Sequence, residues 1–335
     1  VSNVIEPLFG ILGDVRSRRA LILGGGLLFT AELIITAISG SFPVLLAAFV
    51  LLAPASGAFV GLSQAALIDA APERCEQNMA RWTLAGSVGN AAGTLLLAGA
   101  AASGLGWRAL FVGMAGLSLL LVANAWRFSF PTPSRDAERP ERATLRDGAR
   151  DALRALKRRE VLRWLVLLEF ADLTWDVLRG FLALYFVDVV QVSGSEAALA
   201  VLVWTCVGLP GDVLLIPMLE RVSGVRYLRW SVRAVLLLFP AFLLAPGFGL
   251  KLVVLGLLGF ANAGWYSILK ARLYSAMPGQ SGAVLALSNV FGIASGLVPL
   301  ALGAFAGRYG LGPTMWLLLA GPLALLIGLA GAGRK

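Results

Sequence analysis

Residues Gly10–Arg19 read GILGDVRSRR, a short charged stretch between two long apolar runs. A weaker copy follows 206 residues later, where Glu220 stands at the position of Asp14. A constant offset of this kind, held without a gap over roughly a hundred residues, indicates an internal duplication. We therefore predict that the chain contains two copies of one structural half. The same offset also relates Glu6 to Asp212, Gln64 to Lys270, Pro72 to Pro278, Gly86 to Gly292, and GLG at 104–106 to GLG at 310–312.

The composition is that of a membrane protein. Hydrophobic residues make up 58% of the chain and charged residues 14%, and the mean hydropathy is +0.82, outside the range of soluble domains. The apolar runs are each near the roughly 20 residues that a helix needs to cross a bilayer. The short alternating segments of an outer-membrane barrel are absent from the sequence. We predict an all-α membrane protein with spans at 1–13, 20–39, 43–68, 81–103, 107–128, 163–188, 198–219, 227–246, 250–273, 283–306 and 313–331.

Eleven spans are an odd number for a duplicated protein, and the offset accounts for this. The span 163–188 would correspond to positions before residue 1, so we expect the sequence to begin part-way into the second of twelve helices. The expected organisation is an N-terminal half at 1–128, a basic linker at 129–160 and a C-terminal half at 161–335.

Arginine is distributed unevenly over the connections between spans. Most of the basic residues behind the net charge of +9 lie in the linker and in the loops of one side. By the positive-inside rule this side is cytoplasmic, which predicts a multi-pass protein of the bacterial inner membrane with a cytoplasmic C-terminus. Because no basic face lies outside these loops, nucleic-acid binding is not expected. The linker itself suits either a helix on the anionic inner leaflet, in contact with lipids, or a solvated tether.

Several chemistries are excluded by residue types. The chain has no His and only two Cys, so we expect no metal site and no cofactor, and proton handling would fall to carboxylates. The sequence has no G-x-x-x-x-G-K-[ST] run, which argues against ATP as a partner. It also shows no nucleophile or metal constellation, so an enzyme is not expected.

The stretch Gly10–Arg19 resembles the loop signature of the major facilitator superfamily, G-x-L-[AG]-D-x-x-[GS]-R-[KR]. The resemblance continues in the turn Asp69–Arg74, in Trp107-Arg108 and in the basic linker. It implies a two-half helical bundle with a pseudo-two-fold axis along the membrane normal, and secondary transport by alternating access. In this family the loop is understood to close the cytoplasmic side when the cavity opens outward. The diagnostic positions are filled by Gly10, Leu12, Gly13, Asp14, Ser17, Arg18 and Arg19.

The physical logic of this loop can be stated from its residues. Gly10 and Gly13 would let neighbouring helices approach closely, and Asp14 can accept hydrogen bonds from the N-terminus of another helix. Arg18 and Arg19 can pair with Asp14 or hold lipid phosphates; alternatively, the arginines only fix topology. The second copy keeps acid and base but lacks the paired glycines, so its gating role is less well supported. Its candidate residues are Glu220, Arg221 and Arg226.

Four charged residues lie at helical spacing in the span 163–188. Glu169, Asp172, Asp176 and Arg179 fall within roughly an 80° arc of a helix, with Glu169 about 10 Å from Asp176 along the axis. Charges at this depth cost on the order of 2.5–3.5 kcal/mol each, so this acidic stripe must face a polar interior. We expect it to bind protons or a cation. The alternative is a structural network in which Arg179 pairs with an acid of the stripe and Lys270 meets Glu169.

Other intramembrane polar residues are weaker candidates. Glu6 and Asp212 lie at pseudo-equivalent depths and suggest proton sites or a symmetric gate, or else they cap a neighbouring helix. Lys270 lies deep enough to need a carboxylate partner. Near it, Asn262, Trp265 and Tyr266 suit an organic ligand, although aromatic residues at this depth more often pack.

We predict a secondary transporter that moves a small organic solute by alternating access, coupled to protons, with efflux of an organic cation or drug favoured. An uptake permease for a zwitterion or organic anion is the alternative within transport, using Arg179 and Lys270. A transporter-derived sensor or scaffold that moves nothing is the alternative from another class. Membership of the drug/proton antiporter branch is uncertain because the fifth helix, Gly86–Thr94, lacks the proline of that branch.

Overall fold

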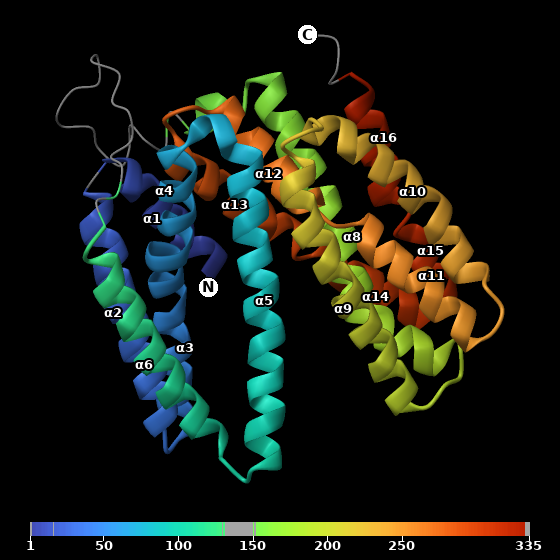
Figure 1. Cartoon of the computed structure of the whole chain (residues 1–335), viewed down its shortest axis with the longest axis horizontal. Coiled ribbons are helices and arrows are strands. Elements are labelled where there is room, and N and C mark those ends of the chain that lie inside the picture. Colours follow the sequence, from blue (N-terminus) through green and yellow to red (C-terminus); the bar gives the residue numbers. More distant parts are fainter. Residues whose placement is uncertain (1, 16, 129, 131–149, 151, 332–335) are drawn as a thin grey trace. The chain divides into compact units, whose positions relative to one another are not determined.

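The computed structural model describes residues 2–15, 17–128, 130, 150 and 152–331, and every regular element in these ranges is helical (Figure 1). The chain divides into two compact units. Neither unit is a sequence half, because each includes a short segment of the other half: unit 1 takes up Leu273–Ile293 and unit 2 takes up Glu76–Ala85. The division into halves at the linker 129–160 stays a prediction, and the linker positions 129, 131–149 and 151 lie outside the described residues.

Unit 1 is built on close contacts between α2 and the helices α3 and α6, which pack along its length (Figure 1). Small residues permit this approach, as is common between membrane helices. A Cβ atom at Gly25 would lie 2.6 Å from the Cβ of Ala58, and one at Gly26 would lie 2.4 Å from a methyl group of Val122. Unit 1 holds α1 (Ser2–Val15), α2 (Arg18–Ile38), α3 (Phe42–Ser56), the π-helix η1 (Gly57–Gly61), α4 (Leu62–Ala70), the 3-10 turn η2 (Pro72–Arg74), most of α5 (Cys75–Ala102), α6 (Trp107–Ala125) and most of α13 (Ser281–Ser295).

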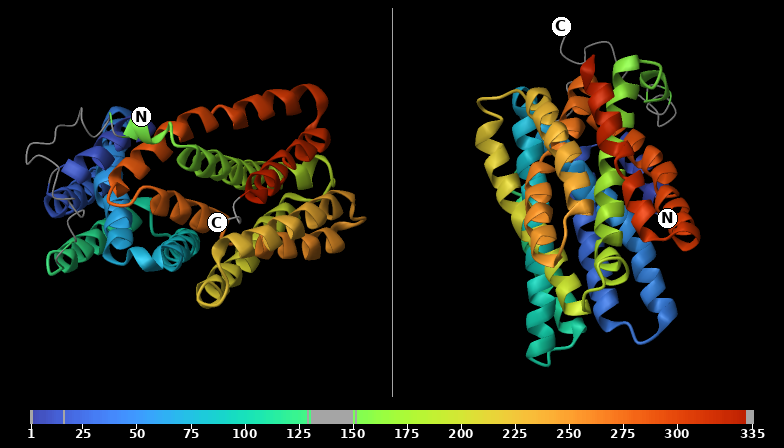
Figure 2. Two further views of the ribbon diagram at one scale, coloured as in Figure 1. Left: turned by 90° about the horizontal axis from the view of Figure 1, so that it is seen from above. Right: turned by 90° about the vertical axis from the view of Figure 1, so that its right-hand side faces the viewer.

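Unit 2 is organised around α9, α10 and α11, where α11 packs against both other helices (Figure 2). Gly211 of α9 allows a close approach, since a Cβ atom there would lie 2.8 Å from the Cβ of Ala263. Unit 2 holds most of α8 (Arg159–Asp188), α9 (Gly194–Met218), α10 (Gly224–Leu244), α11 (Phe248–Ala261), α14 (Val298–Tyr309), α15 (Leu311–Leu317), α16 (Ala320–Ala330) and the larger part of α12 (Trp265–Ala276).

Each predicted span corresponds to one helix or to two or three consecutive helices. Eight segments are long and apolar enough to cross a membrane within the described ranges. The helices α1, α5 and α8 are not among these eight: α1 has only 14 residues, and α8 carries the acidic stripe together with several basic residues. The prediction of an all-helical membrane protein is confirmed.

Four spans that the apolar pattern predicts as continuous helices are interrupted in the described chain. Two of them, 283–306 and 313–331, break between α13 and α14 and between α15 and α16. The span 43–68 contains η1, and the span 250–273 breaks between α11 and α12 at Asn262–Gly264, where Gly264 has a positive φ of 82°. The offset of 206 places Gly57, the start of η1, on Ala263 in this break. Both copies thus depart from α-helical geometry at the same position, as expected for a duplication.

The backbone carbonyls released at the break between α11 and α12 are satisfied by α10. The hydroxyl of Ser231 donates to the carbonyl of Ala261, and the hydroxyl of Tyr227 donates to the carbonyl of Ala263 at 2.9 Å. Such partners are required because an unsatisfied backbone group in apolar surroundings costs several kcal/mol.

Candidate functional site

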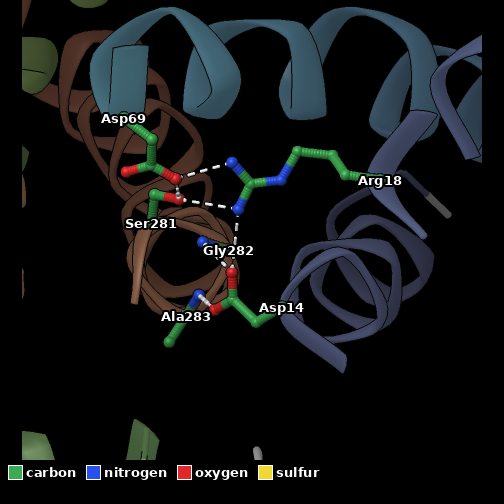
Figure 3. A network of polar contacts seen from close by, with 6 residues as sticks. All are labelled: Asp14, Arg18, Asp69, Ser281, Gly282 and Ala283. Carbon is green, nitrogen blue, oxygen red and sulfur yellow. Dashed lines mark hydrogen bonds and ion pairs between the residues drawn. The ribbon is translucent and has the colours of Figure 1, made fainter. Parts of the chain in front are cut away.

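The last turn of α1 and the first turn of α13 are joined by Asp14. Its two carboxylate oxygens accept hydrogen bonds from the backbone N–H groups of Gly282 at 3.0 Å and Ala283 at 2.9 Å (Figure 3). A carboxylate here satisfies first-turn donors and lies at the positive end of the helix dipole. This is the contact that the sequence analysis expects of Asp14; its part in gating stays a prediction.

A buried guanidinium connects this cap to a second acid. Arg18, at the start of α2, is 1% exposed and reaches Asp14 at 3.1 Å and Asp69 of α4 at 2.6 Å. It also donates to the hydroxyl of Ser281 at 3.0 Å, and that hydroxyl donates to Asp69 at 2.6 Å (Figure 3). We call this set, with the amides of Gly282 and Ala283, the Asp14 network. Removing one partner of such a buried group of charges typically costs about 3–5 kcal/mol.

Glycines set the distance between the helices at this network. A Cβ atom on Gly10 would lie 2.5 Å from the carbonyl oxygen of Gly282, and one on Gly282 would collide with the carbonyl oxygen of Gly10. Gly13 packs against the side chain of Leu62. Arg19 takes no part, since it donates to the carbonyl of Trp126 at 2.7 Å. The predicted role of Gly10 in close helix approach therefore has a direct geometric reason.

The candidate residues of the second loop copy make no comparable contacts. Glu220, Arg221 and Arg226 are exposed, and within the described part of the chain their side chains show no hydrogen bond or ion pair to another helix. The contacts at this place come from Glu76 and Gln77 of α5 instead, two residues that the sequence analysis does not identify.

Glu6 and Asp212 each lie beside the helical irregularity of their own copy. Glu6 packs against Gly57 of η1 and accepts a hydrogen bond from the amide of Asn289 at 3.0 Å. Asp212 interacts electrostatically with Tyr227, the residue that satisfies the carbonyl of Ala263. This correspondence agrees with the predicted pseudo-equivalence of the two acids, whereas a proton-binding role stays a prediction.

The acidic stripe of α8 faces a buried base. Lys270 of α12 is 4% exposed and interacts electrostatically with Asp172 and Glu169. Further along the helix, Asp176 and Arg179 are exposed and interact with each other. The structure thus brings the stripe and Lys270 together. Two acids, Glu169 and Asp172, interact with the buried Lys270, and Asp176 interacts with the exposed Arg179.

The aromatic and amide candidates near Lys270 lie at the break between α11 and α12. Trp265 is buried, and its indole N–H donates to the hydroxyl of Ser231, which is the packing role weighed as the alternative. Tyr266 is half-buried. Asn262 lies within the break, is 8% exposed, and its side-chain oxygen has no hydrogen-bond partner among the described residues.

Besides Glu76 and Gln77, three further side chains of these sites are not predicted from the sequence: Asp69, Ser281 and Asn289. Each of them pairs with a residue more than 50 positions away, and nothing in the local sequence signals that pairing.

The sequence of residues 2–299 matches the family model described as Major Facilitator Superfamily. The chain belongs to the major facilitator superfamily. The fold agrees, since the model superimposes on a variant of the Escherichia coli fucose:proton symporter FucP with a TM-score of 0.81 at 16% identity, over 99% of this chain and 88% of that chain. A second structure of FucP, in the outward conformation, gives 0.80 at 16% identity, over 99% and 87%. The human organic anion transporter MFSD10 (TETRAN) gives 0.75 at 22% identity, over 98% and 80%.

Membership of this superfamily makes the chain a multi-pass membrane protein of a transporter family rather than an enzyme. The resemblance identified from Gly10–Arg19 is confirmed by the family match over nearly the whole chain. The identities of 16–22% to the solved structures show the fold but not the substrate or the direction of transport.

Proposed function

We propose that this chain is a proton-coupled secondary transporter that exports a small organic cation across the inner membrane by alternating access. The C-terminus is cytoplasmic in this proposal, because the arginine-rich loops define that side. The Asp14 network holds the cytoplasmic side closed, and the acidic stripe of α8 carries the proton or the cation.

The observation that carries the proposal is the gathering of three acids on one helix beside a buried base. Glu169 and Asp172 interact with Lys270, and Asp176 interacts with Arg179. Carboxylates at intramembrane depth face a polar interior, and either a proton or a cationic solute can neutralise a carboxylate there. Exchange of one for the other at a shared site couples export to the proton gradient.

The gating part of the proposal rests on the Asp14 network. Its contacts join α1, α2, α4 and α13 through hydrogen bonds to buried charges, each of which contributes about 1.5–3 kcal/mol. Contacts of this size can bias two conformations strongly, but a few such contacts can still be broken in each transport cycle.

The alternative within transport is an uptake permease for a zwitterion or organic anion. Lys270 and Arg179 are the observation that favours it, since a buried ammonium beside two carboxylates could receive both ends of a zwitterion. Among the structural neighbours, FucP is a proton symporter and MFSD10 an organic anion transporter. Their low identity gives this alternative only modest support.

The proposal is tested with purified protein in liposomes that carry a pH gradient. The probes are tetraphenylphosphonium as the organic cation, glycine betaine as the zwitterion and benzoate as the organic anion. A thermal-shift measurement with each probe comes first, because a ligand that binds the folded state raises the midpoint by mass action. We expect tetraphenylphosphonium to raise the midpoint of thermal unfolding and to be transported against its own concentration gradient, driven by the pH gradient. Binding and uptake of benzoate or betaine alone would overturn the export proposal in favour of the permease.

A further inference from the structure

We propose that Glu76, at the start of α5, is a second gating residue: it holds a contact equivalent to that of Asp14 in which the positions of acid and backbone donor are exchanged. The proposal rests on the gating part of the proposed function and identifies the residues that act in the second copy.

The contact joins the first turn of α5 to the loop before α10. One carboxylate oxygen of Glu76 accepts the backbone N–H of Gly224 at 3.0 Å, and the other lies 2.8 Å from the guanidinium of Arg272. The neighbouring Gln77 donates from its side-chain amide to the carbonyl of Leu219 at 3.2 Å. Two consecutive residues of α5 therefore satisfy one donor and one acceptor of the backbone around this loop.

Gly224 is the first residue of α10, so its N–H is one of the donors that the helix cannot satisfy internally. The fit around it is tight: a Cβ atom at this position would lie 2.8 Å from the carboxyl group of Glu76 and 2.7 Å from Ile268. Glu76 also lies in the first turn of its own helix. Its charge is therefore favoured by the dipoles of two helices, α5 and α10.

The offset of 206 relates this contact to the Asp14 network. Glu76 corresponds to Gly282, and Gly224 corresponds to Arg18. In the first copy the acid lies in the last turn of α1, just before the loop, and the N–H groups belong to the first turn of α13. In the second copy the acid lies in the first turn of α5, and the N–H belongs to Gly224, the first residue of α10 after the loop. The same two segments meet in both copies, although the roles of acid and donor are exchanged.

This exchange explains why Glu220 makes no such contact although it occupies the position of Asp14. The carbonyl of Leu219, next to Glu220, already accepts a hydrogen bond from Gln77 of α5. The acid of this contact, Glu76, also lies on α5. By residue type alone Glu220 is the equivalent of Asp14, whereas the geometry assigns the gating contact to Glu76.

Burial predicts the relative strength of the two contacts. The side chains of Asp14 and Arg18 are 6% and 1% exposed, whereas those of Glu76 and Arg272 are 17% and 34% exposed. An ion pair that is partly open to solvent contributes less than a buried one, so the hydrogen bond to Gly224 is the main part of the second contact. We therefore expect the loss of the Asp14 side chain to weaken its contact most, followed by the loss of Glu76 and then of Arg272.

The test measures backbone hydrogen exchange in the full chain in lipid nanodiscs, at the amide of Gly224 and at the amides of Gly282 and Ala283. In Glu76→Gln the lost charge weakens the bond to Gly224, and we expect exchange there to become about tenfold faster. If both contacts close together in one gating step, exchange at Gly282 and Ala283 also rises in this variant. A merely local structural role would change Gly224 alone.

Glu73→Gln is the matched control, because Glu73 is an exposed acid three residues earlier in the chain; it should leave all three amides unchanged. If Glu76→Gln folds poorly, Arg272→Gln tests the same contact. In this variant we expect a smaller increase in the rate of hydrogen exchange at the same three amides. Wild-type exchange at Gly282 and Ala283 in both Glu76→Gln and Arg272→Gln overturns the inference, whether or not any probe is transported. A coupled rise with no transport of tetraphenylphosphonium instead supports the gating role and counts only against the proposed substrate.

Discussion

Asp14→Asn removes the charge from the Asp14 network while keeping the shape of the side chain. The asparagine retains one oxygen, which can accept from either Gly282 or Ala283, but its amide then faces the remaining N–H group. One of the two bonds, at 3.0 and 2.9 Å, is therefore lost. The guanidinium of Arg18 also loses one of its two carboxylate partners.

The magnitude follows from the burial of this carboxylate, whose side chain is 6% exposed. A hydrogen bond to a buried charged group contributes about 1.5–3 kcal/mol. This corresponds to a change of roughly 10- to 150-fold in the equilibrium between closed and open contact, at about 1.4 kcal/mol for each factor of ten. The amides of Gly282 and Ala283 exchange with solvent only when the contact opens. We therefore expect hydrogen exchange at these two amides to become at least tenfold faster in Asp14→Asn.

Asp69→Asn separates the cap from the rest of the network. This variant removes the carboxylate partner of Arg18 on α4 but leaves both bonds of Asp14 to α13 intact, so its effect on the two amides should be smaller. Equal exchange at Gly282 and Ala283 in wild type and in Asp14→Asn would refute the reasoning, because the charge would then contribute nothing to the contact.

Three further predictions concern other parts of the molecule. Asp176→Asn should abolish gradient-driven transport in liposomes and leave counterflow at least partly intact. Wild-type coupling in this variant would exclude Asp176 as the proton site. If the variant is instead destabilised, and adding Arg179→Gln restores stability, the two residues form a static pair. Gly10→Ala should lower the thermal midpoint by the equivalent of about 1–3 kcal/mol, because the added methyl meets the α13 backbone, whereas Gly24→Ala, with open space around it, should not. Lys270→Met should cost about 3–5 kcal/mol at neutral pH, since it leaves buried carboxylates without their base; an unchanged urea midpoint would show that Lys270 is not paired.

Most of the helices could be predicted from the sequence because long apolar runs determine them. The interruption at Asn262–Gly264 could not, since a single Asn and a single Gly within a long apolar run also occur in continuous membrane helices. The partners that make the break possible, Tyr227 and Ser231, lie on another helix. Arg18 illustrates the same limit: its position in a known motif predicts a contact to Asp14, but its almost complete burial depends on Asp69. The duplication predicted where the second contact lies, yet not that its acid is on the opposite segment.

The two hydroxyl groups that α10 donates to the broken helix restrict how this part of the protein can move. If α10 slid away from α11 and α12, the carbonyls of Ala261 and Ala263 would lose their donors in apolar surroundings, at a cost of several kcal/mol for each group. The indole of Trp265 would lose its acceptor on Ser231 in the same movement. The break between α11 and α12 is therefore unsuited to act as a hinge. We therefore expect these parts of α10, α11 and α12 to move together in any conformational change.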